Sequence, residues 1–129
     1  MTNFWQQYAI NVRRNLEMFY KKYANKYYSG EIQFEFEELE FVVEGKPYYG
    51  NGTAIINYEA ESDDFGRLFV KDYEIYQIHE AEATDYDGYD APVSKEMITE
   101  IVKILDDTPQ RQEAIYEKIF EDIDWSKRD

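Results

Sequence analysis

The chain has 129 residues, of which 28 are acidic and 14 basic, and its formal net charge is −14. This length fits one domain, and the charge disfavours direct binding to nucleic acid phosphates or anionic membrane surfaces. Because the chain has no cysteine, it can form neither a disulfide framework nor a zinc–thiolate site. Aromatic residues make up 18% of the sequence, which favours a packed core over a disordered acidic chain.

The N-terminal segment is predicted to form one long helix from Asn3 to Tyr28. Apolar side chains recur there at spacings of three and four residues, as on the buried face of a helix. These residues are Trp5, Tyr8, Val12, Leu16, Phe19, Tyr23 and Tyr27. We expect Ser29-Gly30 to end the helix, with Gly30 in a left-handed conformation. The apolar stripe should pack against the rest of the domain.

This N-terminal helix is also basic, with five basic residues against Glu17, a net charge of 5 − 1 = +4. The basic residues are Arg13, Arg14, Lys21, Lys22 and Lys26. Such a face has the charge needed to contact the acidic part of a second copy, so a homodimer is one expectation. The first ten residues lack the basic and apolar regions of a signal peptide, and no apolar stretch reaches the ~20 residues of a membrane span. We therefore expect a cytoplasmic protein.

The middle of the chain, 30–83, is predicted to form a three-stranded antiparallel meander, because its connections are too short for parallel crossovers. In the first strand, apolar residues alternate with glutamates, and the alternation changes phase at Glu37-Glu38, which predicts a β-bulge. The segment from Glu44 to Gly52 contains three glycines and a proline and is predicted to be a loop. The second strand should run from Thr53 to Ala60 and the third from Arg67 to Glu82.

The C-terminal part should comprise an acidic loop, 84–92, and a helical pair, 93–125. Ser94 is a suitable N-cap for a helix that runs to about Leu105, and Thr108-Pro109 is typical of the start of a second helix. The predicted fold is therefore a single α+β domain, with a basic N-terminal helix over 1–29 and helices packed on one face of an antiparallel sheet.

No motif for nucleophilic, nucleotide-dependent or zinc-dependent catalysis is present. His79 is the single histidine and is expected to be a surface or structural residue. The loop from Asp85 to Asp90 resembles the start of a calcium loop, but Tyr89 and Asp90 stand where an EF-hand requires Asp or Asn and then Gly. We therefore predict no metal, no cofactor and no enzymatic activity. A carboxylate-based hydrolase remains an alternative.

Charge distribution is the strongest functional signal in the sequence. Between Glu59 and Asp90 there are eleven acidic residues against Arg67 and Lys71, a local charge of −9, and they are interleaved with tyrosines. Aromatic residues anchor protein interfaces and charge steers the encounter. The predicted partner-binding residues are Asp63, Asp64, Asp85, Tyr86, Asp87, Tyr89 and Asp90.

In size and charge the chain resembles the small acidic proteins that phages and mobile elements use against host defences. This resemblance implies a non-enzymatic inhibitor that binds a basic nucleic-acid-binding protein as a DNA mimic, of the anti-CRISPR or anti-restriction type. It is similar in the same respects to immunity proteins, so neutralisation of a basic toxin is an alternative.

Overall fold

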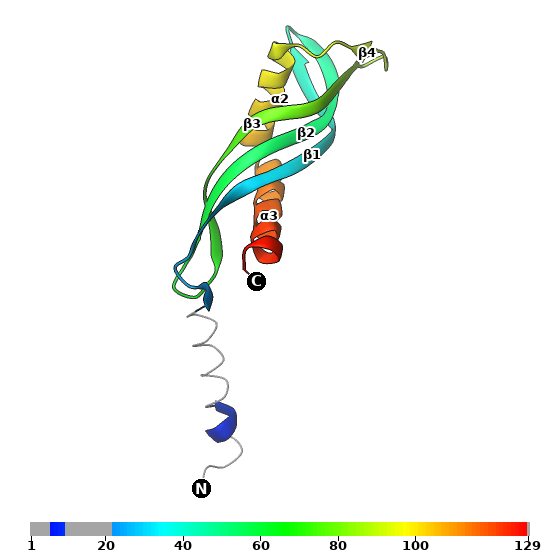
Figure 1. Ribbon diagram of the computed structural model, residues 1–129. Coiled ribbons are helices and arrows are strands. Elements are labelled where there is room, and N and C mark those ends of the chain that lie inside the picture. The colour runs from blue at the N-terminus through cyan, green and yellow to red at the C-terminus, as the bar shows by residue number, and fades with distance from the viewer. Residues whose placement is uncertain (1–5, 10–21, 129) are drawn as a thin grey trace.

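The computed structural model describes residues 6–9 and 22–128, and its architecture is α+β (Figure 1). Four antiparallel strands form one sheet in the order β1-β2-β3-β4, and two helices, α2 and α3, follow them in the chain. The elements are β1 Tyr27–Val43, β2 Lys46–Ser62, β3 Leu68–Asp85, β4 Asp90–Ala91, α2 Lys95–Asp107 and α3 Pro109–Ser126. The α+β class and the antiparallel sheet are confirmed, but the predicted three-stranded meander lacks the short fourth strand.

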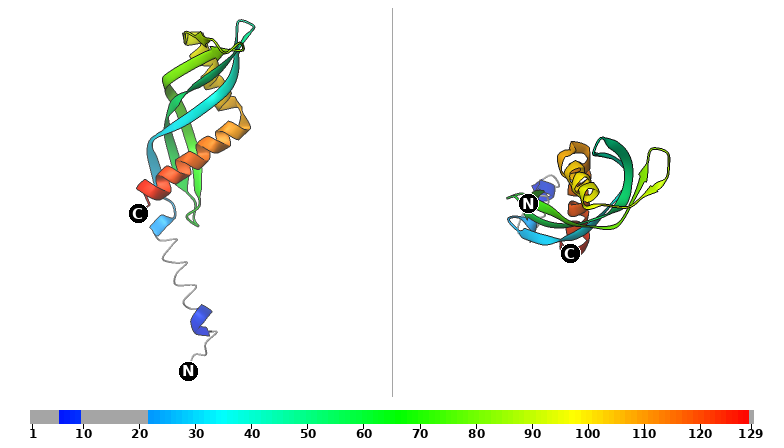
Figure 2. Two further views of the ribbon diagram at one scale, coloured as in Figure 1. Left: turned by 90° about the vertical axis from the view of Figure 1, so that its right-hand side faces the viewer. Right: turned by 90° about the horizontal axis from the view of Figure 1, so that it is seen from above.

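The sheet is long and curved, and both helices lie on one side of it (Figure 2). Its curvature follows from four register shifts, of which one lies in the β1–β2 pairing and three lie in the β2–β3 pairing. A bulge bends its strand and increases the local twist. The shift in β1 falls between Phe36 and Leu39, which confirms the predicted bulge, and Glu38 has a φ of 48° there.

The core lies between the sheet and the two helices. The helices bury one residue per turn, namely Met97, Ile101 and Leu105 from α2 and Ile115, Ile119 and Ile123 from α3. Both predicted helix starts are confirmed: the Ser94 hydroxyl accepts a hydrogen bond from the Met97 N–H at 3.2 Å, and Pro109 occupies the first turn of α3. The capping residues in the sequence therefore start both helices at positions that allow their apolar residues to pack into the core.

The predicted loop from Glu44 to Gly52 is wrong, because most of it belongs to β2. Glu44 and Gly45 form a two-residue turn, and both have positive φ (52° and 77°), as a type I′ hairpin requires. The two later glycines serve packing instead. A Cβ at Gly50 would lie 3.0 Å from the Phe41 ring, and one at Gly52 would lie 2.9 Å from the Phe36 ring. Two buried aromatic rings of β1 therefore occupy the space over these glycines.

The predicted end of the N-terminal helix is also wrong. The chain turns at Asn25, which has a φ of 53°, and β1 begins at Tyr27, so Gly30 lies inside a strand. The Ser62 hydroxyl, which is buried, fixes this turn by accepting from the Lys26 N–H and donating to the Tyr23 carbonyl. Tyr8 is 58% exposed and does not pack into the core. The other residues of the predicted stripe between Trp5 and Phe19 lie outside the described residues.

Candidate functional site

The seven predicted partner-binding residues lie at the two ends of β3. Asp63 and Asp64 belong to the turn between β2 and β3, whereas the segment from Asp85 to Asp90 connects β3 to β4. A strand of 18 residues rising roughly 3.3 Å per residue separates the two groups by some tens of ångströms. The structure therefore does not bring these residues together on one surface.

The first group is organised around the Asp63 carboxylate. One of its oxygens accepts hydrogen bonds from the backbone N–H groups of Phe65 and Arg67, both at 2.9 Å, and the other lies 3.0 Å from the Arg67 Nε. Gly66 completes the turn with a φ of 79°. The N–H of Arg67 is the main cause of the lowered pKa of Asp63. This carboxylate shapes a turn, and only Asp64 of the pair is exposed.

The second group contains the same turn. Asp85 accepts from the N–H groups of Asp87 and Tyr89 at 3.0 Å, and Gly88 has a φ of 86°. Asp85 is therefore a turn residue as Asp63 is, and the shared pattern D-x-x-G in the two segments is a signal that our reading of the sequence missed. The side chains that this turn presents to solvent are those of Tyr86, Asp87, Tyr89 and Asp90.

Of the two predicted anchor tyrosines, one has an intramolecular partner. Tyr86 stacks on Tyr49 with ring centroids 5.2 Å apart and the planes inclined by 17°. Hydrogen bonding to Tyr86, and next to Glu40, raises the pKa of Tyr49 to about 12. Tyr89 is 72% exposed and has the larger free surface of the two.

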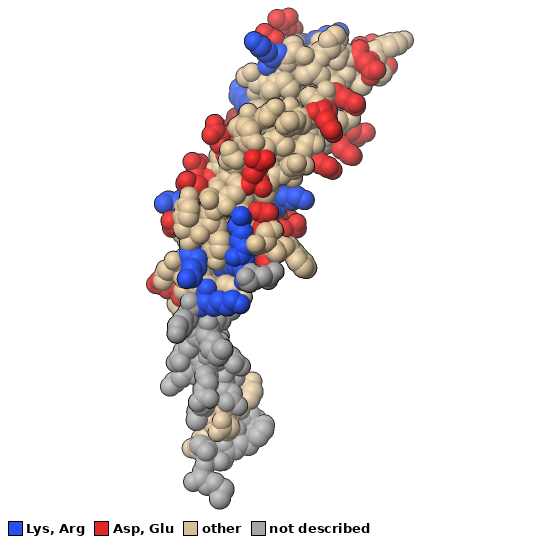
Figure 3. All heavy atoms as spheres, in the orientation of Figure 1, with Lys and Arg blue, Asp and Glu red and all other residues tan. Residues whose placement is uncertain are grey.

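A larger acidic surface lies on the side of the sheet that faces away from α2 and α3, which we call the open face. Strand alternation and the cross-strand register place eight acidic residues there. They are Glu31, Glu35, Glu40, Glu59, Glu61, Asp72, Glu74 and Glu82. Lys71 is the basic residue among them, and its Nζ lies 3.2 Å from Glu61. In Figure 3, acidic side chains extend along both flanks of the sheet, and several basic ones gather near its lower end.

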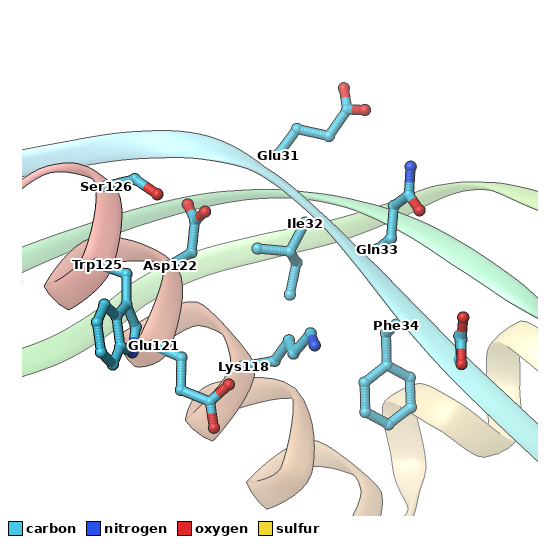
Figure 4. Close-up of a pocket in the computed structure, with 10 residues that line it drawn as sticks. Glu31, Ile32, Gln33, Phe34, Lys118, Glu121, Asp122, Trp125 and Ser126 are labelled. Carbon is cyan, nitrogen blue, oxygen red and sulfur yellow. The ribbon is translucent and has the colours of Figure 1, made fainter.

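A groove runs beside β1, between this strand and α3. It has a volume of about 650 Å³ and is lined by residues 31–35 of β1 and by side chains of α3. Ile32 and Phe34 point toward α3, whereas Glu31 and Gln33 point away from it (Figure 4). Trp125 stands at the end of the groove and is 81% exposed. The lining contains four acidic residues, Glu31, Glu35, Glu121 and Asp122, against Lys118, a net charge of −3.

A buried tyrosine fixes the position of α3 beside β1. The Tyr58 hydroxyl, from β2, donates to an Asp122 oxygen at 2.5 Å, and burial is the main reason that the pKa of Tyr58 is raised. Gly30 pairs with Tyr58 across the strands, and a Cβ there would lie 2.9 Å from the hydroxyl oxygen. Glycine at this position therefore lets the side chain pass over β1 to the helix, and the width of the groove depends on this contact.

The remaining candidates concern metal binding and catalysis. Within residues 6–9 and 22–128, no three His, Asp or Glu side chains are grouped as metal ligands. His79 is exposed on β3, opposite Thr53. Burial raises the pKa of Asp106 at the junction of α2 and α3.

None of the helices in the described part of the chain has the length and apolar character that crossing a bilayer requires. Comparison of the chain with protein-family models, with curated proteins and with solved structures finds no match.

Proposed function

We propose that this chain is a non-enzymatic acidic protein that binds a basic nucleic-acid-binding protein through the open face and thereby excludes nucleic acid from it. One observation supports this proposal above the others. Among the described residues of β1, β2 and β3, the open face has at least eight acidic side chains, with Lys71 as the basic residue among them.

The arrangement of these acids disfavours a purely solubilising role. Glu59 lies directly opposite Asp72 in the β2–β3 ladder, and like charges in this position destabilise a sheet. A surface that only confers solubility is best served by interspersed charges of both signs. Adjacent strands are about 4.8 Å apart, which is less than the ~8 Å Debye length at physiological ionic strength. Acids on neighbouring strands, such as Glu59 and Asp72, therefore act together toward a basic partner.

Such a field suits a partner whose natural ligand is a polyanion. A surface that binds nucleic acid backbone presents several lysines and arginines to regularly spaced phosphates. An acidic face that occupies this surface would compete with nucleic acid for the same basic residues. This is the physical basis of the DNA-mimic hypothesis, and it predicts that nucleic acid and this chain bind the partner in a mutually exclusive way.

The test uses two variants that change the net charge equally. The face variant carries Glu59→Lys, Asp72→Lys and Glu74→Lys. The control carries Asp107→Lys, Glu113→Lys and Glu117→Lys, which reverse exposed acids of α2 and α3. Each protein is immobilised and used to capture partners from a lysate of the source cells, with circular dichroism to verify folding.

We expect one basic protein to bind the wild type and the control but not the face variant, and a DNA duplex to release it. The wild type should also block binding of that protein to labelled DNA. Equal capture by both triple variants, or a captured protein that still binds DNA in the complex, contradicts the proposal. Capture of a toxin whose activity is neutralised would assign the same face to an immunity protein.

A further inference from the structure

We propose that the free edge of β1 beside α3 binds an extended segment of a partner protein, in which basic and apolar residues alternate, as an added strand of the sheet. The proposal rests on the proposed function for the basic character of the partner, and it adds the mode of binding. Strand addition at a sheet edge derives its affinity from main-chain hydrogen bonds and its specificity from alternate side chains.

The first observation is that β1 has unused backbone groups. It stands first in the sheet order, so within residues 6–9 and 22–128 no strand pairs with its other edge. The Ser62 N–H donates to the Lys26 carbonyl, which fixes the phase of the β1–β2 ladder. Because bonding alternates along an antiparallel ladder, the N–H and C=O groups of Glu31, Gln33 and Glu35 point away from β2.

The second observation is the regularity of this edge compared with the other one. From Tyr27 to Phe36, β1 pairs with β2 without a register shift. The β2–β3 pairing is interrupted by three shifts, and β4 covers Ala83 and Thr84 at the end of β3. Bulges and short covering strands are devices that block an edge against further pairing. The regular half of β1 has no such device.

The third observation is the chemistry on the two sides of the edge. Side chains of an added strand would alternate as those of β1 do. One set would point toward the helix side, where the partly buried Phe34 and the exposed Trp125 offer apolar surface. The other set would lie beside Glu31 and Glu35 on the open face. A segment with apolar residues on one side and lysine or arginine on the other complements both.

The probe is a nine-residue peptide of alternating lysine and valine, acetylated and amidated at its ends, with a fluorescent label. A second peptide has the same composition with its lysines and valines in two separate blocks. Binding is followed by fluorescence anisotropy, and the amide resonances of the protein identify the site. We expect the alternating peptide to bind about tenfold more tightly, a difference of ~1.4 kcal/mol, and to shift the resonances of residues 31–36.

Two variants distinguish strand addition from charge attraction alone. Gln33→Pro removes an edge N–H that the β1–β2 ladder does not use, and edge strands tolerate proline, while Gln33→Ala is the matched control that keeps the N–H. Trp125→Ala removes an exposed side chain and should not affect folding. We expect Gln33→Pro and Trp125→Ala each to weaken binding about tenfold, and Gln33→Ala to leave it nearly unchanged.

Equal binding of the alternating peptide by all three variants, with loss of binding only in the open-face charge reversal, would overturn strand addition and leave the proposed function intact. Absence of binding of the alternating peptide to the wild type, or equal binding of the two peptides, would also overturn it. The capture experiment with the face variant is independent of these results, so the two proposals can fail separately.

Discussion

The turn from Asp63 to Arg67 and the turn from Asp85 to Tyr89 have the same backbone and different surroundings. In each, an aspartate accepts hydrogen bonds from the N–H groups two and four residues later, and a glycine with positive φ follows. The first turn is held by Arg128 and adjoins Ser62, which bonds the segment that leads into β1. The second projects beyond the sheet, with its tyrosines exposed.

The contacts of the first turn come from residues far away in the sequence. The Arg128 guanidinium donates to the Gly66 carbonyl and lies over the rings of Tyr23 and Tyr28, 4.9 and 5.8 Å from their centroids. Ser62, just before the turn, bonds the segment that leads into β1. Two identical local motifs thus differ in their tertiary contacts, and the second turn has more of its side chains exposed to a partner.

The largest difference in unfolding free energy between the two turns should appear when a hydroxyl is removed near each of them. Ser62→Ala leaves the Lys26 N–H and the Tyr23 carbonyl without their partner at a buried site, which should cost about 1–3 kcal/mol of unfolding free energy. Thr84→Val removes a hydroxyl near the second turn and should change stability by about 0.5 kcal/mol or less. Urea denaturation of both variants measures this, and equal losses would contradict the difference in anchoring.

A somewhat smaller loss of stability should follow from removal of the Arg128 contacts with Gly66, Tyr23 and Tyr28. Arg128→Gln removes two cation–π contacts from a side chain that is 14% exposed, which should destabilise the fold by about 1–2 kcal/mol. Lys127→Gln removes an exposed charge from the neighbouring residue and should have an effect within about 0.5 kcal/mol. If the two variants have the same thermal unfolding midpoint, the Arg128 side chain does not stabilise the first turn.

The first turn should also contribute to acid sensitivity. The pKa of Asp63 is lowered from 3.8 in the folded state, mainly by the Arg67 N–H. A depressed carboxyl pKa stabilises the fold above the unfolded pKa, and this contribution is lost as the pH falls through the folded pKa. Asp63→Asn should therefore flatten the decline in melting temperature below about pH 4. Asp64→Asn controls for the charge, and equal flattening would refute a specific role for Asp63.

The smallest effect on stability is expected at the second turn. Asp87→Lys with Asp90→Lys changes exposed side chains that accept no turn hydrogen bond, so the unfolding free energy should stay within about 0.5 kcal/mol of wild type. The association rate with the captured basic partner should fall, and the difference should diminish at high salt. Stopped-flow kinetics over a salt series measures this. An unchanged association rate would show that these acids do not contribute to recognition.

The sequence predicted those features that depend on neighbouring residues. The β1 bulge, the Ser94 cap and the Pro109 start are local patterns, and each is confirmed. The Glu44-Gly45 hairpin was missed because Gly50 and Gly52 resemble loop residues, although their role is to accommodate rings from another strand.

The candidate site was less predictable because it depends on register and docking. Glu31 and Glu35, which alternate with apolar residues in the predicted first strand, do lie on the open face. The predicted third strand, Arg67 to Glu82, is nearly as long as β3 and already separates Asp63 from Asp85, so grouping them by local charge alone was wrong. The β1–α3 groove depends on the contact of Tyr58 with Asp122, which are 64 residues apart. No pattern in the sequence indicates that pairing, so Trp125 was not recognised as part of a groove.

The measurement that tests the central claim most directly is the footprint of the captured partner on the labelled chain. Amide resonances should shift for the open-face residues of β1, β2 and β3 and for residues 86–90, and those of the outer surface of α2 should stay in place. Addition of a DNA duplex should reverse the shifts. A footprint confined to α2 and α3, or shifts that persist with excess DNA, would contradict binding of a basic partner through the acidic open face.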